Sequence, residues 1–294
     1  MHDRLTIVRP PALGAALDRA AGEACARPIA VSAGDLPLLD ARLACGDFEG
    51  VLIVLRDAPA APALPLFLAR YMSWSGDLQS AAAVWDTVLA SLDAVLGDEA
   101  DPGLRRATCV ELARTATDLG HAPLAARLHG IARRHAADSA DSADPADSAD
   151  SADSADSADS ADSADSPQTD PDCRLIHDVA FNILGIEPDA SRGRLRLRPR
   201  LGRFDQLEAH HIRLGDASVS MTALWGDEGC AIRVEQDTGS IPLTVLLEPF
   251  VTRPGPALVD GEPADLAPQT LADGTILPVQ LVLDHARTLV IGPH

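Results

Sequence analysis

The fold is indicated most clearly by the stretch from residue 183 to residue 199, ILGIEPDASRGRLRLRP. Before it, apolar residues from Leu175 to Leu184 recur at helical spacing, and Gly185 is a helix stop signal. Within it, Leu195 and Leu197 alternate with arginines, which is the period of a half-buried strand. The sequence therefore predicts a change from helix to sheet at this point.

From this junction to the C-terminus, short alternating segments are separated by turn residues. Val219 and Met221 alternate with polar neighbours before a turn at 226–229, and residues 241–247 and 279–291 repeat the pattern. Many short strands joined by tight turns are typical of an antiparallel β-sandwich. We therefore expect residues 173–294 to form one helix followed by such a sandwich.

Residues 1–135 have the pattern of a helical segment. Apolar residues at helical spacing predict helices over 81–96 and 104–119 and from Pro123 onward, with Asp77 as the N-cap of the first. The segment 63–74 precedes them, and two earlier helices are expected around 11–25 and 36–46.

A low-complexity tract separates these two parts. Asp recurs at every third position from Asp138 to Asp165, mostly in an Asp-Ser-Ala unit. A period of three fits neither a helix nor a half-buried strand, and alanine buries too little surface to offset chain entropy. We expect 136–172 to be a disordered linker. Calcium binding by the tract is an alternative, but it lacks the Gly and terminal Glu of a structured calcium loop.

Composition excludes several classes of protein. The net charge is −20, and because twelve of the acidic residues are Asp within 136–172, the remaining parts are only mildly acidic. General affinity for nucleic acid is not expected. The five cysteines form no CxxC pair, and neither a signal peptide nor a membrane span is apparent. We expect a cytoplasmic protein without cofactor or metal.

Two segments resemble a known family. Asp57-Ala58 followed by LFLARYMSWSGD (residues 66–77) resembles the Asp-Ala … Leu-x-x-Tyr-x-x-x-Thr-Gly-Asp stretch of glycogen-debranching-type members of the six-hairpin, (α/α)-barrel glycosidases, with Ser75 in place of the usual Thr. The stretch 183–199 looks like the passage where the last barrel helix of these enzymes enters a C-terminal β-sandwich. The resemblance implies an α+β multidomain chain: a partial α/α toroid over 1–135, the disordered linker, then the last barrel helix and the antiparallel β-sandwich.

The departures from this family bear on function. Six hairpins need twelve helices, whereas the sequence predicts about seven, so the N-terminal half of the barrel is missing. The family places a catalytic carboxylate just before the last helix, where this chain has the Asp-Ser-Ala tract. We therefore expect a truncated or degenerate enzyme related to glycoside hydrolases of α-glucans, without a complete active site of its own. Its expected partners are carbohydrate and a chain that supplies the missing half-barrel. The alternative is a non-catalytic sugar-binding or protein-interaction scaffold.

Three residues are candidates for substrate binding. The resemblance puts Asp57 at the sugar-binding end of the barrel, and its alternative role is a helix N-cap. Tyr71 and Trp74, with Trp85, would form a sugar-stacking surface, although at helical spacing such residues more often lie in the core. No residue is assigned as catalytic.

Other polar residues have simpler interpretations. Glu111 is expected to be solvated or to cap a helix, and His210 and His211 to point to opposite faces of a strand. Arginines at every second position from Arg192 to Arg200 would share one face of a strand. That face is either a solvated edge strand or a surface that attracts the acidic tract; contact with anionic glycans is a third alternative.

Overall fold

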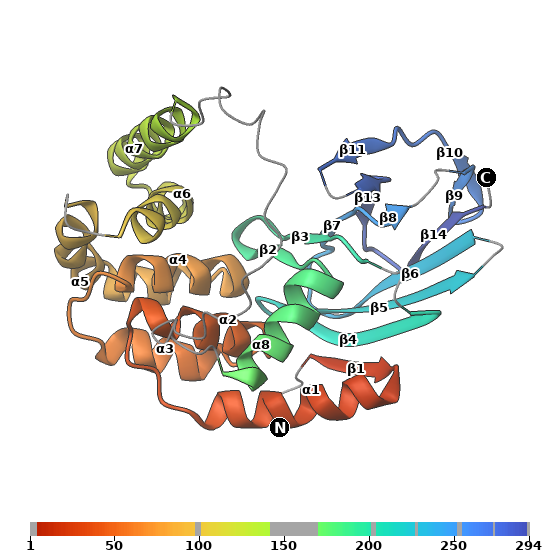
Figure 1. Cartoon of the computed structure of the whole chain (residues 1–294), viewed down its shortest axis with the longest axis horizontal. Helices are drawn as coiled ribbons and strands as arrows, with labels where there is room; N and C mark the ends of the chain where they lie inside the picture. The colour runs from red at the N-terminus through yellow and green to blue at the C-terminus, as the bar shows by residue number, and fades with distance from the viewer. Residues whose placement is uncertain are drawn as a thin grey trace, which may run out of the picture.

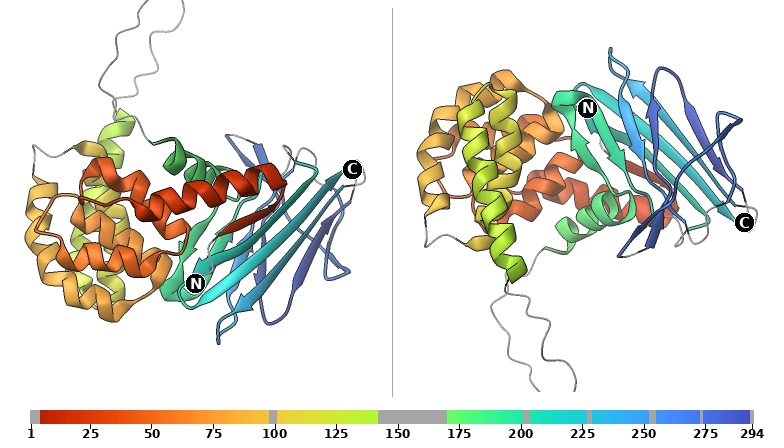
Figure 2. Two further views of the ribbon diagram at one scale, coloured as in Figure 1. Left: turned by 90° about the horizontal axis from the view of Figure 1, so that it is seen from below. Right: turned by 90° about the horizontal axis from the view of Figure 1, so that it is seen from above.

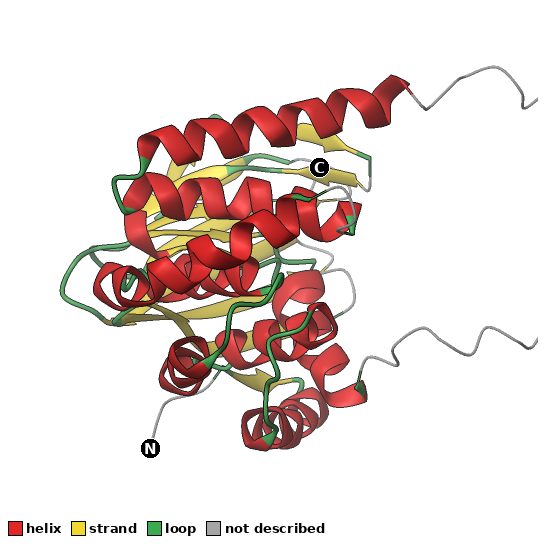
Figure 3. Cartoon of the chain, turned by 90° about the vertical axis from the view of Figure 1, so that its left-hand side faces the viewer, coloured by secondary structure: helices red, strands yellow, loops and turns green. Residues whose placement is uncertain are grey.

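The computed structural model describes residues 5–97, 101–141, 170–200, 204–226, 229–251, 255–272 and 274–292. Helices gather on one side of the molecule and β-sheets on the other, and the two parts lie against each other (Figure 1). Seen from the helical side, the helices stand in front of the strands (Figure 3). The α+β class and the succession of helices and then strands predicted from the sequence are confirmed.

The helices of the described part form a two-layered array. Helix α4 packs between α2 and α6, and α2 also packs against α8, so these four make one layer. Helix α1 packs against α2 and α8, α3 against α2 and α4, α5 against α4 and α6, and α7 against α6. The bounds are α1 (Pro11–Ala26), α2 (Leu36–Ala44), α3 (Phe48–Asp57), α4 (Leu64–Ser75), α5 (Leu78–Leu96), α6 (Pro102–Asp118), α7 (Ala122–Asp141) and α8 (Pro171–His177).

Most of these helices match the sequence prediction, and local signals explain why. The Asp77 carboxylate accepts a hydrogen bond from the Ser80 amide at 3.0 Å, which confirms it as the N-cap of α5. Helix α3 was not predicted, because its five consecutive apolar residues from Val51 to Leu55 show no alternation of apolar and polar residues at helical spacing. The alternative role of Asp57 as an N-cap is wrong, since Asp57 is the last residue of α3.

The predicted linker begins and ends inside regular structure. Helix α7 continues to Asp141, and α8 begins at Pro171. The rest of the Asp-Ser-Ala tract, 142–169, lies outside the described residues, as does its predicted disorder.

The strands form three sheets. The largest has the order β1-β4-β5-β6-β14-β9-β10, the second β13-β7-β3-β2 and the third β11-β12-β8. Among the described strands the pairs are antiparallel, as predicted for this part of the chain, except for β3 with β7, which is parallel. The bounds are β1 (Thr6–Arg9), β2 (Glu187–Asp189), β3 (Arg194–Leu197), β4 (Gln206–Leu214), β5 (Ala217–Gly226), β6 (Gly229–Thr238), β7 (Thr244–Leu247), β8 (Phe250–Val251), β9 (Ala257–Val259), β10 (Glu262–Ala264), β11 (Gln269–Leu271), β12 (Gly274–Ile276), β13 (Val279–Val282) and β14 (Arg287–Ile291).

Helices and sheets share one hydrophobic core. Strand β1, near the N-terminus, was expected to be helical but pairs antiparallel with β4, with Thr6 opposite His210. Figure 2 shows α1 and β1 lying together alongside the large sheet. The Gly215 amide in the β4–β5 turn also donates a hydrogen bond to the Trp74 carbonyl at 2.8 Å. Buried residues therefore form a single cluster that continues from the helical array into the sheets.

The helix-to-sheet junction is fixed by backbone contacts. After α8 the helix continues as a π-helical turn, η2 (Asp178–Ile183), and ends at Gly185, whose φ is +62°. The Arg198 amide donates to the Leu184 carbonyl at 3.0 Å, and a Cβ at Gly185 would lie 2.5 Å from the Arg198 carbonyl oxygen. Glycine is therefore required there by both conformation and space. Within the described ranges, no helix is long and apolar enough to cross a bilayer.

Candidate functional site

The three residues predicted to bind substrate do not lie together. Asp57 is exposed at the end of α3, whereas Tyr71 and Trp74 are each only 2% exposed within α4. The Tyr71 hydroxyl donates to the Asp77 carboxylate at 3.2 Å, and Trp74 meets the ring of Phe181 edge-on. These contacts favour the packing interpretation of both aromatic residues. Their role, like that of Asp57, stays a prediction.

A charged cluster lies across three neighbouring helices of one layer. Arg70 on α4 donates from Nη1 to both carboxylate oxygens of Asp40 on α2, at 3.1 and 3.0 Å. Its Nε forms an ion pair with the carboxylate of Glu111 on α6. The side chain of Asp40 is 10% exposed, against 31% for Arg70 and 26% for Glu111. One partly accessible guanidinium therefore holds two mostly buried carboxylates.

Burial governs the electrostatics of this cluster. Burial raises the pKa of Asp40, although Arg70 and then His177 oppose the rise. Burial also raises the pKa of Glu111, again against the attraction of Arg70. For Arg70, burial lowers the pKa, but the two carboxylates outweigh it and the pKa is raised. Both carboxylates are thus costly to ionise and depend on Arg70 for compensation.

Two residues of this cluster, Glu111 and Asp40, were not recognised from the sequence. Glu111 was expected to be solvated or to cap a helix, and that interpretation is wrong because it is ion-paired with Arg70. Asp40 was not singled out. The available signal was the position of two charged residues, Asp40 and Arg42, among the apolar residues from Leu38 to Leu43, because a buried carboxylate needs a cationic partner.

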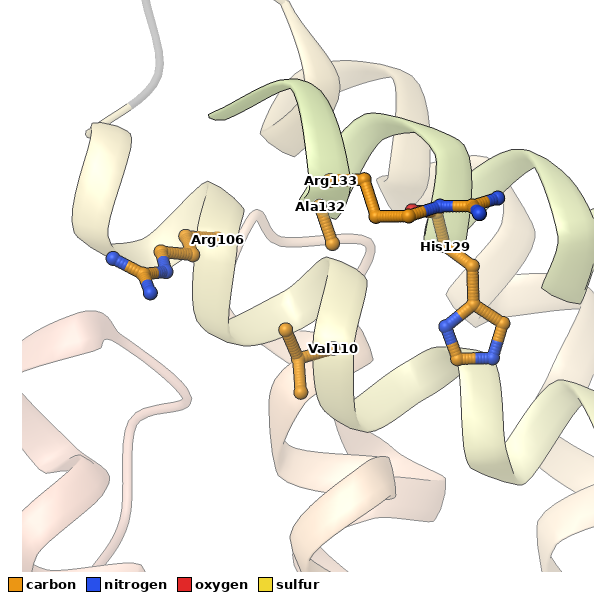
Figure 4. Close-up of a pocket in the computed structure, with 5 residues that line it drawn as sticks. All are labelled: Arg106, Val110, His129, Ala132 and Arg133. Carbon is orange, nitrogen blue, oxygen red and sulfur yellow. The ribbon is translucent and has the colours of Figure 1, made fainter. Parts of the chain in front are cut away.

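The last hairpin of the array, α6 with α7, carries a groove of about 480 Å³ (Figure 4). Val110 and Ala132 face each other across it, with Arg106 at one end and His129 and Arg133 at the other. Half of the Val110 side chain is exposed. The partner chain expected to supply further hairpins stays a prediction.

The outer face of the large sheet carries a polar network. His210 contacts the Ser220 hydroxyl through Nδ1 at 2.8 Å and the Glu208 carboxylate through Nε2 at 3.0 Å, and Ser220 donates to Asp237 at 2.7 Å. The predicted opposite orientation of His210 and His211 assumed a regular strand. It fails because β4 has a bulge there, with His211 at a φ of +59° and both residues partly exposed.

The arginine series does not share one face of a strand. Arg192 lies in a 3₁₀ turn, η3 (Ala190–Arg192), and β3 ends before Arg198. Strand β3 is internal to its sheet, so the edge-strand interpretation is also wrong. Most arginines of the series already contact other side chains of the described structure. Arg192 pairs with Asp118 and Asp189, and Arg196 pairs with Glu187. Arg198 pairs with the buried Glu248, and Arg200 lies over the ring of Phe250. These contacts partly neutralise the arginines, which weakens the electrostatic attraction that the series could exert on the acidic tract.

Comparisons with known proteins come from structure alone. No family model matches the sequence, and no curated protein matches it either. A solved structure of alpha-L-rhamnosidase from Dictyoglumus thermophilum matches with a TM-score of 0.59 at 9% identity. The match covers 99% of this chain but 50% of the other, so the chain spans half the length of that protein. The described helices and sheets therefore share their fold with part of a glycoside hydrolase.

Proposed function

We propose that this chain is a carbohydrate-binding protein on a glycoside hydrolase fold, and that it does not hydrolyse glycosides on its own. The lack of hydrolysis is supported by one observation: the guanidinium of Arg70 binds the carboxylates of both Asp40 and Glu111. Glycoside hydrolysis needs one carboxyl group that delivers a proton and a second that acts as base or nucleophile. Two carboxylates held by the same cation are poorly placed for these separate roles.

The half-length match to a rhamnosidase structure supports the carbohydrate part of the proposal. A debranching-type relationship, suggested by the residues at 66–77 and 183–199, adds α-glucans to the candidate ligands. If this chain takes part in glycoside hydrolysis, we expect the activity only together with a partner chain that completes a ring of helices.

The test combines a binding and a turnover measurement on the full chain. Binding of maltotriose and of methyl α-L-rhamnopyranoside is followed by NMR, and hydrolysis of the matching p-nitrophenyl glycosides by absorbance. We expect binding of at least one sugar and no hydrolysis. Turnover that disappears in Glu111→Gln would refute the non-catalytic role, whereas absence of binding to every sugar would refute the carbohydrate role.

A further inference from the structure

A cavity of about 920 Å³ opens between the end of α1, the start of α2 and helix α8 with η2. Its volume is at the upper end of the range for small-molecule sites, which leaves room for more than one sugar ring. The polar side chains around it are Arg27, Asp170, Arg174, His177, Asp178 and Asn182. Most of them come from one short segment, α8 and the turn that follows it.

That segment has irregular backbone at the cavity wall. In η2 the Leu184 amide donates to the Val179 carbonyl, five residues earlier, at 2.9 Å. Such π-helical turns are rare and are found frequently at functional sites. Asp178 and Asn182 both lie in this turn and line the cavity, with the Asn182 amide donating to the Asp178 carboxylate at 2.8 Å.

The charges of the lining indicate a neutral ligand. Its two guanidinium groups are balanced by its two carboxylates, and Arg27 is already paired with Asp170. Arg174 is exposed and has no ion-pair partner among the residues that the structure describes. An anionic ligand would be repelled by the two carboxylates of the lining. An apolar ligand would displace water from six polar side chains without replacing its hydrogen bonds, which is unfavourable. A polyhydroxylated ligand satisfies both donors and acceptors.

The cavity also adjoins the charged cluster. His177 lines the cavity, and it is one of the groups that oppose the rise in the pKa of Asp40, the more buried carboxylate bound by Arg70. The ring of His177 packs against Phe181 with centroids 4.8 Å apart, and Phe181 in turn meets Trp74. The cavity wall is therefore supported by the helix that carries Arg70.

We infer that this cavity binds a neutral oligosaccharide, with Arg174 and Asn182 donating to sugar hydroxyls and Asp178 accepting from them. The inference rests on the proposed carbohydrate function and names the place and the ligand class for it. The rings of Pro37 and Pro171 in the lining provide apolar surface for the C–H face of a sugar.

The experiment measures dissociation constants of maltotriose and methyl α-L-rhamnopyranoside for the full chain by NMR titration. Asn182→Ala and Arg174→Ala change exposed side chains, so both variants are expected to fold. Each should weaken binding of the sugar that binds by about tenfold, the effect expected from losing a well-formed hydrogen bond. The matched control is Arg133→Ala, an exposed arginine of the α6–α7 groove, which should leave binding unchanged.

The outcomes separate this inference from the function on which it rests. If the wild type binds a sugar and both cavity variants bind it equally well, the cavity assignment is overturned and the carbohydrate function stands. Tighter binding of digalacturonate than of either neutral sugar would overturn the assignment to a neutral ligand. If the wild type binds no sugar, both proposals fail.

Discussion

Replacing Arg70 by leucine removes the cation that compensates two mostly buried carboxylates. Removing one partner of a buried ion pair costs about 3 to 5 kcal/mol, since the remaining charge is left without compensation. Because Arg70 and Glu111 keep 31% and 26% of their side-chain surface exposed, water screens part of the loss. We therefore expect Arg70→Leu to lower the free energy of unfolding by about 3 kcal/mol near neutral pH.

The loss should depend on pH in a defined direction. The pKa values of Asp40 and Glu111 are raised by burial above their ordinary 3.8 and 4.5, and without Arg70 they rise further. A carboxyl group with a raised pKa binds more protons in the folded state than in the unfolded state. Stability therefore falls as pH rises from the ordinary value through the raised one, and is recovered on acidification. The difference between variant and wild type should be largest at neutral pH and should shrink toward about pH 5.

Urea unfolding followed by tryptophan fluorescence at about pH 5 and about pH 8 measures both effects. The control is Arg233→Leu, because Arg233 is 57% exposed and pairs with Glu235, which is 47% exposed. It should change stability by less than about 1 kcal/mol at either pH. An Arg70→Leu loss that matches the control, or that is identical at both pH values, would refute this account of the cluster.

Further predictions concern the scaffold. Tyr71→Phe removes a hydrogen bond to the N-cap of α5 and should cost about 1 kcal/mol in a urea titration; no change would mean the 3.2 Å contact is not stabilising. Gly185→Ala places a Cβ against the Arg198 carbonyl at a positive φ and should cost about 2 to 3 kcal/mol or more, so an unchanged melting temperature would contradict the junction geometry. Burial raises the pKa of Cys230 to about 12, so this thiol should not react with Ellman's reagent near neutral pH until the protein unfolds, and rapid reaction in the native state would contradict its burial.

Local signals in the sequence predicted a large part of the fold. The cap at Asp77, the stop at Gly185 and the alternation around Leu195 are each determined by neighbours in the chain, so periodicity and turn chemistry identified them. Helix α3 was missed because it lacks a visible period. The pairing of β1 with β4 was missed because its partner lies about 200 residues away in sequence.

The pairing of residues within the charged cluster lies beyond this kind of reasoning. Asp40, Arg70 and Glu111 come from three helices, and only packing of α2, α4 and α6 brings them together. Their residue types alone indicate solvated side chains, which is how Glu111 was interpreted. Similarly, the bulge at His211 depends on the register between β4 and β5, which alternation in one strand does not reveal.

We expect this chain to bind carbohydrate without cleaving it, because Arg70 engages the carboxylates of both Asp40 and Glu111. The most direct measurement is product formation from p-nitrophenyl α-L-rhamnoside and from maltotriose by concentrated full-length protein. We expect no product above the amount formed by the Glu111→Gln variant. Product formed by the wild type and absent from Glu111→Gln would contradict it, since a carboxylate held by Arg70 would then be doing the chemistry.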